Sequence, residues 1–420
     1  MQAMSSSETV LVWSITAGTL GGVLFRPRQW PEWVWACLGA LLLVVCGLIS
    51  PAAALSAAGR GTDVYLFLAG MMLLADLARA EGVFDWLANH AVCASKGSGG
   101  RLFVLIYAAG VLVTVFLSND ATAVVLTPAV YAAVRKARTD AVAYVLICAF
   151  VANAASFVLP ISNPANLVVY GKTLPPLGPW LRTFFLPSLC ATGATYAALR
   201  WAVRKEISGA IANDADLTVL TSEGRRAAWG IAGAGAVLVA ASALGLDLGL
   251  PTCAAALMAL LATTRLRLRR AASIAGGVSW SVLPLVAGLF VLVAALNRAG
   301  ASEAIARLSE TMARMPRVPG DLAASFGIAT LSNVMNNLPS GLLVGSALQT
   351  GAAVSPIRDA VLVGVDLGPN LSVTGSLATV LWLIALRRDG AQMSSWRFLK
   401  VGCLVMPPAL FLATVTLRLL

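Results

Sequence analysis

Charged residues are scarce in this sequence of 420 residues. Asp, Glu, Lys and Arg together make up 12% of it, whereas 59% of the residues are hydrophobic and the mean hydropathy is +0.83. Soluble proteins carry about 25% charged residues, so a soluble globular fold is excluded and an all-α polytopic membrane protein is predicted. The net charge of +11 does not indicate a nucleic-acid partner, because the 30 Lys and Arg residues gather at the ends of apolar runs.

Histidine and paired cysteines are also nearly absent. His90 is the only histidine, which excludes a multi-histidine metal site. The seven cysteines show no C-x-x-C spacing, so neither disulfides nor metal sites are predicted, and no cofactor is expected. The first eight residues contain no Lys or Arg. The apolar run at about 10–25 therefore lacks the basic region of a cleaved signal peptide and is predicted to remain as a membrane helix.

Two stretches about half the chain apart have the same plan. Residues 116–130 read FLSNDATAVVLTPAV and residues 330–345 read TLSNVMNNLPSGLLVG, so each holds a Ser-Asn pair between apolar arms. The first pair begins at Ser118 and the second at Ser332. We interpret residues 101–135 and 321–349 as re-entrant hairpins. A polar tip at membrane depth is tolerated only where protein or a water-filled cavity surrounds it.

Two further apolar segments are interrupted by polar residues and prolines. The first, about 141–170, contains Asn153, Pro160 and Pro164; the second, about 357–386, contains Asp366 and Pro369. Proline removes a backbone donor and keeps the preceding residue out of the helical region, so each segment is predicted to be a broken helix.

The whole chain is predicted to consist of two inverted repeats. With about 20 apolar residues per span, residues 1–203 and 228–420 each provide five transmembrane helices, one of them broken, plus a hairpin. A polar cytoplasmic linker at 204–227 joins them. Five is odd, so the two halves must have opposite orientations. Placing the N- and C-termini outside puts 21 of the 30 Lys and Arg residues on the cytoplasmic side, as the positive-inside rule prefers.

Polar tips and broken helices at corresponding places of inverted repeats are typical of transporters that work by alternating access around a mid-membrane site. Asn and Ser side chains both donate and accept, so they can replace the hydration shell of a small polar solute. The alternative is that they only cap and pack helices. The candidate substrate-binding residues are Ser118, Asn119, Asn163, Asn166, Ser332, Asn333, Asn336, Asn337, Asn370, Thr374 and Ser376.

Only two acids occur in the four interruptions, Asp120 and Asp366. Their counterparts in the opposite repeat are predicted to be Val334 and Asn153. An ionisable group at membrane depth indicates function, so both acids are predicted proton carriers. For Asp120 the alternative is a helix N-cap. Asp76 stands three residues before Arg79, which favours an ion pair on one helix over a role in transport.

The most distinctive motif is VGVDLGPNLSVTGSLATVLWL at 363–383. Together with SND and SNVMNNLP it resembles the ArsB-type arsenite permeases of the ion transporter superfamily, and the likeness covers most of the chain. The resemblance implies proton-driven export of arsenite and antimonite across the bacterial inner membrane, in some systems with a cytoplasmic ATPase subunit. Other members of the superfamily carry dicarboxylates, citrate, sulfate, or sodium and protons. One departure is Asn153, where members can carry an acid.

The residue types suit that substrate. Arsenite at neutral pH is an uncharged trihydroxide, and the four interruptions contain no Lys or Arg. No cysteine stands at the tips, so we expect no Cys ligand and interpret the cysteines as packing residues. A sodium- or proton-coupled anion transporter, or a sodium/proton antiporter, remains the alternative, since helix N-termini alone can hold an anion. A membrane enzyme is disfavoured, because no nucleophile and base are visible near Ser118 or Ser332.

Overall fold

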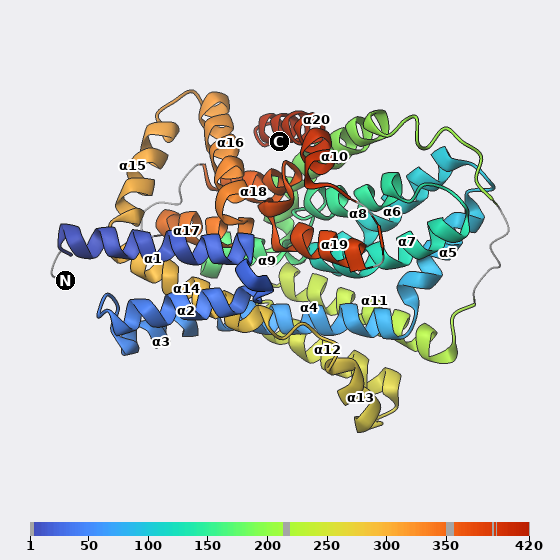
Figure 1. The fold of residues 1–420 in the computed structure, drawn as a ribbon, viewed down its shortest axis with the longest axis horizontal. Helices are drawn as coiled ribbons and strands as arrows, with labels where there is room; N and C mark the ends of the chain where they lie inside the picture. The colour runs from blue at the N-terminus through green and yellow to red at the C-terminus, as the bar shows by residue number, and fades with distance from the viewer. Residues whose placement is uncertain (1–3, 213–218, 350–356, 389, 392, 420) are drawn as a thin grey trace.

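The protein is built from helices. The computed structural model describes residues 4–212, 219–349, 357–388, 390–391 and 393–419. Within these residues it contains no strand, apart from one isolated bridge between Ser98 and Ala210 (Figure 1). The prediction of an all-α fold is confirmed.

The helices of the first half are α1 (Ser6–Phe25), α2 (Glu32–Val45), α3 (Pro51–Gly59), α4 (Thr62–Ala80), α5 (Val83–Ala94), α6 (Gly99–Phe116), α7 (Thr127–Lys136), α8 (Val142–Ala154), α9 (Pro164–Tyr170) and α10 (Leu177–Ala202). This half begins with four helices, α1 to α4, of which α3 is the shortest (Figure 1). The amphipathic helix α5, the hairpin helices α6 and α7, the broken helix α8–α9 and the long helix α10 follow. Short 3-10 turns interrupt the chain at Pro27–Gln29, Pro160–Ser162 (η3) and Gly171–Thr173 (η4), and a π-helix occupies Ala121–Leu126 (η2).

The second half repeats this order. Its broken helix contains the 3-10 turns Gly368–Asn370 (η5) and Val373–Gly375 (η6). The helices are α11 (Ser222–Ala243), α12 (Gly249–Thr264), α13 (Leu268–Ala275), α14 (Val282–Arg298), α15 (Ala301–Ala313), α16 (Arg317–Met335), α17 (Asn337–Gln349), α18 (Arg358–Leu367), α19 (Leu377–Arg388) and α20 (Ser395–Thr416).

Local signals explain several of these boundaries. Gly82 and Gly300 precede the two amphipathic helices α5 and α15 and have φ angles of 71° and 91°. Glycine adopts this left-handed conformation without steric cost, so the chain can turn sharply from α4 into α5 and from α14 into α15. The broken helices also correspond, because the turn η3 leads into α9 in the first half as the turn η6 leads into α19 in the second.

The register of the two hairpins differs from the predicted one. In the first hairpin Thr122 donates its amide and hydroxyl to the carbonyl of Ser118; in the second, Ser340 does the same to Asn336. Ser118 and Asn336 are the non-helical residues at which the two hairpins break, so aligning the breaks makes Asn336 and not Ser332 the counterpart of Ser118, and the Ser332-Asn333 pair lies inside α16.

The new register also corrects the predicted counterpart of Asp120. Aligned at the breaks, Leu338, two positions after Asn336, stands where Asp120 stands, in place of the predicted Val334. Val334 is 65% exposed on the outer surface of α16. The second hairpin thus carries no ionisable residue where the first carries Asp120.

Length and hydropathy alone support part of the predicted set of spans. Among the described residues α1, α6, α11 and α20 are long and apolar enough to cross a membrane. The pairs α3 with α4 and α14 with α15 would add two more if each bent pair is one span. Thus α6, predicted as one arm of a re-entrant hairpin, has the length of a full span. The helices α2, α8 and α12 are apolar but shorter.

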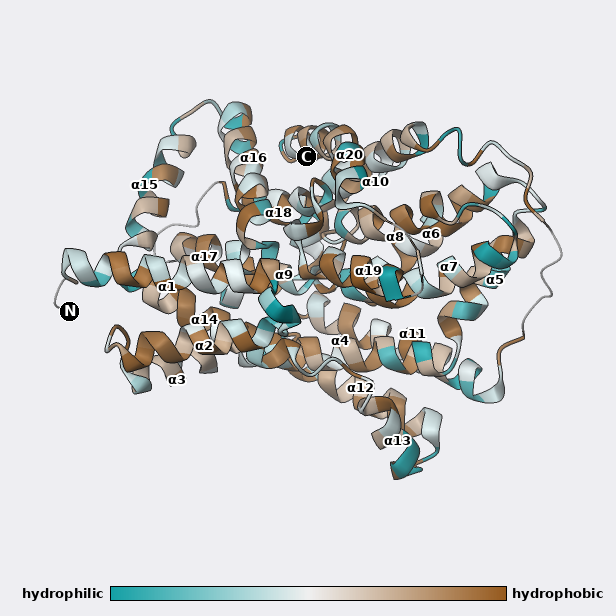
Figure 2. Ribbon diagram, in the orientation of Figure 1, coloured by the Kyte–Doolittle hydropathy of each residue, from teal (hydrophilic) through white to brown (hydrophobic). Residues whose placement is uncertain are grey.

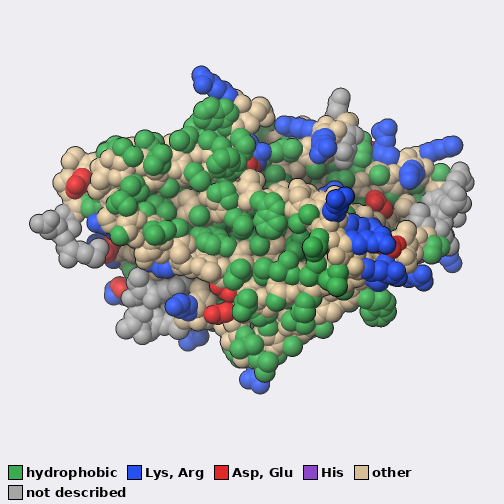
Figure 3. Space-filling view, turned by 90° about the horizontal axis from the view of Figure 1, so that it is seen from below, with side chains coloured by type: hydrophobic (Ala, Val, Ile, Leu, Met, Phe, Trp, Pro, Cys, Tyr) green, Lys and Arg blue, Asp and Glu red, His purple; other side chains and the backbone are tan. Residues whose placement is uncertain are grey.

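The outer surface is that of a membrane protein. Hydrophobic residues dominate the long helices, while hydrophilic residues stand out on α5 and α13 (Figure 2). Seen from below, hydrophobic side chains cover the middle of the face, and Lys and Arg gather mainly towards its right-hand end (Figure 3). Exposed large apolar side chains such as Phe25, Val45 and Leu250 are expected to face lipid.

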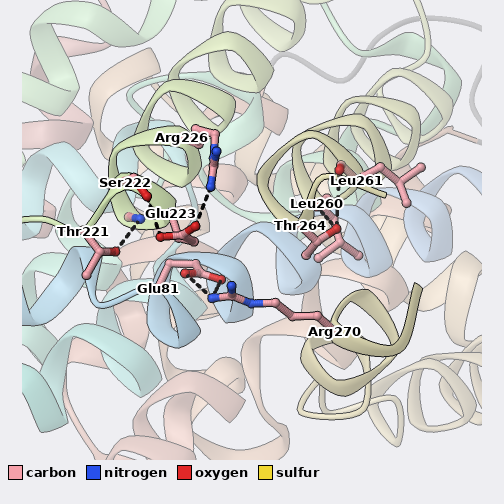
Figure 4. Close-up of polar contacts among 10 residues, drawn as sticks. Glu81, Thr221, Ser222, Glu223, Arg226, Leu260, Leu261, Thr264 and Arg270 are labelled. Atoms are coloured by element: carbon pink, nitrogen blue, oxygen red, sulfur yellow. Dashed lines mark hydrogen bonds and ion pairs between the residues drawn. The ribbon is translucent and has the colours of Figure 1, made fainter. Parts of the chain in front are cut away.

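The predicted linker is shorter than expected. Residues 213–218 lie outside the described part of the chain, and α11 begins at Ser222, five residues before the predicted end of the linker at residue 227. The helix starts there because Thr221 caps it, accepting a hydrogen bond from the Gly224 amide at 2.9 Å. An ion pair between Glu223 and Arg226 supports the first turn (Figure 4).

The broken helices occupy the centre of the fold. Every residue from Ala143 to Ala154 of α8 is buried, as is almost every residue of α18. A helix that is apolar on all sides has no face for solvent, so burial at the centre is its stable place. The pairs α4 with α12, α2 with α14 and α10 with α20 pack around this centre.

Candidate functional site

The two broken helices cross-link each other through polar side chains. Asn163, before α9, donates from Nδ2 to Oδ1 of Asp366 in α18 at 2.7 Å. Asn153, near the end of α8, donates to Oδ1 of Asn370 at 3.0 Å, and Asn370 donates to the Phe150 carbonyl at 3.1 Å. All four side chains belong to residues that are at most 3% exposed. The fold therefore brings three of the predicted site residues, Asn163, Asp366 and Asn370, into two buried cross-links between the broken helices.

The breaks are stabilised by capping side chains. Asn163 accepts from the Ala165 amide at 3.0 Å and so caps α9, while Ser376 accepts from the Thr379 amide at 3.1 Å and caps α19. Asn166 donates to the Ser156 carbonyl at 2.9 Å and to two further carbonyls of the unwound segment. The expected alternative role, helix capping, is thus present at Asn163, Asn166 and Ser376, because an unwound backbone in the membrane must find internal partners.

Several buried polar atoms have no hydrogen-bond partner among the described residues. They include Oδ2 of Asp366, Oδ1 of Asn153, Oδ1 of Asn166 and Oγ of Ser332. A buried polar atom without a partner costs about 1–3 kcal/mol. The three acceptors on Asp366, Asn153 and Asn166 lie on the two broken helices, where a proton or a hydroxyl donor could satisfy them.

A small cavity opens at the tip of the first hairpin. This inner cavity has a volume of about 70 Å³ and is lined by Ser118 and Asp120 of the tip and by Asp76 of α4. Pro164 and Leu377, the first residues of α9 and α19, also line it, so the start of each half-helix adds positive potential. No Lys, Arg or Cys is among these lining residues.

A larger cavity lies next to the inner one. This vestibule has a volume of about 520 Å³ and is lined by Arg79, Asp85, Tyr131 and Arg135, among others. Val125 of the π-helix η2 lines both cavities, so the two adjoin at this residue, and we call this boundary the neck. A π-helical turn widens a helix and is frequent at functional sites. Its cause here is Pro128, which has no amide to offer an i−4 carbonyl.

Asp120 does not cap its helix. Its carboxylate makes no capping hydrogen bond, and the Ala121 amide donates to the Ser118 hydroxyl instead, at 3.2 Å. Asn119, 3% exposed, accepts from the Asp120 amide at 2.9 Å. The alternative interpretation of Asp120 as an N-cap is wrong, and Asp120 lines the inner cavity instead.

The predicted residues of the second hairpin lie elsewhere. Asn333 donates to the Gly368 carbonyl at 2.8 Å and accepts from the Ser372 hydroxyl at 2.6 Å, while Thr374 donates to the Asn333 carbonyl at 3.1 Å. Asn336 is the break itself, and Asn337 begins α17; both are buried. These residues of the second hairpin do not line the inner cavity or the vestibule. The same holds for Ser332 and for Asn119.

Sequence reasoning missed three residues that the fold brings to the site. From the sequence, Asn153 is predicted to interrupt a helix and to be the neutral counterpart of Asp366, but not to be a site residue, although an Asn in an otherwise apolar helix is a usable signal. The ion pair predicted between Asp76 and Arg79 is present, but Asp76 also lines the inner cavity. Ser279, in the loop before α14, lines it too and carried no signal in the sequence.

The broken helices are also joined by contacts away from the two cavities. The Tyr170 hydroxyl donates to Asp359 at 2.6 Å, and the Arg358 guanidinium donates to Thr173 at 2.8 Å. Arg418 forms an ion pair with Asp321, and the hydrogen bonds to this carboxylate raise the pKa of the Arg418 guanidinium. The Tyr170 and Arg358 contacts link the end of α9 to the start of α18, so they hold the two halves of the chain together there.

Comparison with protein families and curated proteins finds similar proteins along the whole chain. The model of a citrate transporter family, CitMHS, matches residues 12–364. An arsenical pump membrane protein of Escherichia coli K12 is 27% identical, with 98% of this chain and 99% of that protein covered. A protein of the same description from Yersinia enterocolitica is 28% identical with the same coverage. An uncharacterized transporter of Mycobacterium tuberculosis is 26% identical, with 86% of each chain covered.

Among solved structures, the fold matches a transporter. The crystal structure of the Alcanivorax borkumensis YdaH transporter, described as having an unusual topology, superposes with a TM-score of 0.52. The match covers 92% of this chain and 96% of that one at 15% identity, which supports the fold alone. The resemblance to ArsB-type permeases of the ion transporter superfamily, predicted from the sequence motifs, is confirmed by the full-length matches to the arsenical pumps.

Proposed function

The chain belongs to the citrate transporter family, and from this premise we propose that it is a secondary active transporter that exports arsenite and antimonite from the cytoplasm in exchange for protons. That it is a multi-pass membrane transporter rests on the family and on its apolar helices. The substrate, the coupling ion and the alternating-access cycle are our proposal. By analogy with the arsenical pumps, its location would be the bacterial inner membrane.

The observation that carries the proposal is the size and lining of the inner cavity. Its volume of about 70 Å³ is far below the roughly 300–1,000 Å³ of pockets for drug-sized ligands. A solute of a few heavy atoms suits it, and citrate does not. Its lining combines one hydroxyl-bearing tip residue, Ser118, with the carboxylate of Asp120 and no cationic side chain. Hydroxyl groups of an uncharged trihydroxide can donate to such acceptors.

Alternating access is supported by a difference between two regions of the protein. One region is hollowed by the two cavities, whereas in the other the halves of the chain are joined by the contacts around Tyr170. The vestibule lies beside Arg79 and Arg135, which the positive-inside rule assigns to the cytoplasm, whereas Tyr170 and Arg358 link the halves of the chain elsewhere. We assign this conformation to the inward-facing state. In the cycle, protonation of Asp366 and Asp120 from outside and release of substrate would occur after the contacts around Tyr170 and Arg358 open.

Transport in everted membrane vesicles tests the proposal. With NADH as the energy source, arsenite should accumulate in vesicles that contain the protein, because eversion turns the cytoplasmic side outwards. A protonophore should abolish this uptake, and replacing potassium by sodium should not change it. Vesicles from cells without the protein are the control. Failure to take up arsenite would refute the substrate.

A second candidate is a sodium- or proton-coupled anion transporter, or a sodium/proton antiporter, of the same superfamily. The observation that favours it is the start of α19 at the inner cavity, because the unpaired amides at a helix start attract anions. A strict requirement for a sodium gradient in the same vesicle experiment, with sulfate or a dicarboxylate as substrate, would support this candidate.

The inverted repeats with both termini outside remain a prediction, supported by the repeated helix order. Alkaline phosphatase fused after the last residue should be active, because it folds only in the periplasm, whereas green fluorescent protein at the same place should not fluoresce. A fusion truncated after Lys205, at the start of the linker, should give the opposite result. Fluorescence of the full-length fusion would contradict this topology.

Whether a cytoplasmic ATPase subunit binds is a separate proposal, carried over from the resemblance to ArsB-type permeases.

A further inference from the structure

The neck between the vestibule and the inner cavity carries an ion pair whose two partners face different cavities. Arg79 lines the vestibule and Asp76 lines the inner cavity, and the two form an ion pair within one turn of α4. The Arg79 side chain is 54% exposed and the Asp76 side chain only 13%. The pair therefore lies at the boundary between the vestibule and the inner cavity.

The second half of the chain covers the pair from the other side. A Cβ atom on Gly277 would lie 2.7 Å from Nη2 of Arg79 and 3.3 Å from Oδ1 of Asp76, so the backbone of this loop presses directly on both side chains. Ser279, two residues further on, lines the inner cavity. Close by, Arg270 of α13 donates two hydrogen bonds of 2.8 Å to Glu81, the residue after α4, and fixes α13 against α4 (Figure 4).

The charges around the neck are unevenly distributed. The vestibule holds Arg79 and Arg135 against one acid, Asp85, and is cationic on its own. The inner cavity holds Asp76 and Asp120 and no Lys or Arg. Asp76 therefore stands where it cancels the charge of Arg79 at the point of passage. An isolated ion pair in which the Arg79 side chain is half exposed contributes little to the stability of the fold. Stability alone therefore does not explain why the pair lies at the neck.

We propose that the Asp76–Arg79 pair is a charge filter at this neck, in which Asp76 makes the passage selective for uncharged solutes by neutralising Arg79. The proposal rests on the proposed function, because it identifies what keeps oxyanions such as phosphate from competing with a neutral trihydroxide. Without Asp76 the neck carries an unpaired cation and concentrates anions; without Arg79 it carries an unpaired anion and concentrates cations.

The charge filter can be tested without knowing the substrate. Val125→Cys places a thiol at the residue shared by the two cavities, and its rate of reaction with an anionic and a cationic methanethiosulfonate is measured in everted vesicles. The parent chain, with its seven native cysteines, supplies the background. Adding Asp76→Asn should raise the anionic-to-cationic rate ratio about tenfold or more, and adding Arg79→Gln should lower it by a similar factor.

The double variant Asp76→Asn/Arg79→Gln should return the ratio to that of Val125→Cys alone. The matched control is Glu223→Gln, which removes the acid of another i,i+3 pair, at the start of α11 (Figure 4), and should leave the ratio unchanged within about twofold, as exposed pairs act weakly at a distance. Single variants that leave the ratio unchanged, or a double variant that keeps the shift of either one, would overturn the charge filter. The opposite signs expected for the two single variants keep the test decisive if one of them does not fold.

Competition links the charge filter to transport. Inorganic phosphate should not inhibit arsenite uptake by the native protein, but should inhibit uptake by the Asp76→Asn variant, and the double variant should again be insensitive. Insensitivity of Asp76→Asn to phosphate would count against the charge filter. If the native protein takes up no arsenite, the proposed function fails, while the thiol-reaction ratios still decide whether the pair filters charge.

Discussion

The variant Asp366→Asn is expected to reduce proton-driven arsenite uptake about 100-fold or more, the effect that removal of a positioned proton-transfer group typically has. Asp366 is fully buried, accepts a hydrogen bond from Asn163 through Oδ1, and has no partner for Oδ2 among the described residues. A charge held there without compensation is costly in the membrane, so the side chain is expected to carry a proton in part of the cycle. An asparagine cannot bind or release that proton.

The substitution is otherwise conservative, because the amide oxygen of Asn can still accept from Asn163. Exchange of arsenite across the membrane without a proton gradient should therefore persist in Asp366→Asn vesicles, which separates a role in coupling from a role in binding. The matched control is Asp63→Asn on α4, which can still accept from the Gly249 amide and should keep at least about half of the uptake, since a carbonyl oxygen is an adequate acceptor. Full, pH-dependent uptake by Asp366→Asn would refute the proton-carrying role.

The second large effect is expected from Gly364→Val, which should destabilise the protein by about 3 kcal/mol or more, the upper end of the range for overpacked cores. A Cβ atom at Gly364 would lie 2.3 Å from the Ser325 carbonyl oxygen and 2.4 Å from Cγ2 of Ile328. The first contact is to backbone, so a side-chain rotation cannot relieve it and α18 must move away from α16. Because Asp366 is two residues further along α18, the site would move with it.

The measurement is thermal unfolding of the detergent-solubilised protein, followed by size-exclusion chromatography. The matched control is Gly327→Val on α16, where a Cβ atom would meet nothing within 4 Å. This exposed position should tolerate valine, since valine is no worse in a helix than glycine. Equal stability of the two variants, whether both native-like or both impaired, would contradict the close packing of α18 on α16.

Much of the fold could be predicted because its causes are local. The prolines at 160, 164 and 369 end or interrupt helices wherever the rest of the chain lies. Glycines at 82 and 300 mark the turns into the two amphipathic helices, and Asp76 and Arg79 pair because they are one turn apart. Hydrophobicity placed these elements in a membrane. Each of these forces acts between residues that are neighbours in the sequence, so the sequence alone carries them.

The site was only partly predictable, because it depends on which elements meet. The two Ser-Asn pairs look equivalent, yet Ser118 lines the inner cavity and Ser332 lies inside α16, where its hydroxyl has no partner among the described residues. The register that matches Ser118 with Asn336 became visible only from the places where the two hairpins leave the helical conformation. The repeated sequence pattern predicts that each half contains a hairpin. Packing against the rest of the protein decides at which residue each hairpin leaves the helical conformation.

By itself the sequence determined the class of the protein, its helices, the places where they break and the candidate acids, since these follow from transfer free energy and local backbone sterics. Only the tertiary structure decided that Asn163 meets Asp366, that Asn153 meets Asn370, and that Asp76 and Arg79 lie against the loop at Gly277. Each of these contacts joins one half of the chain to the other. Their geometry depends on helix packing across the two halves, which no pattern within one half specifies.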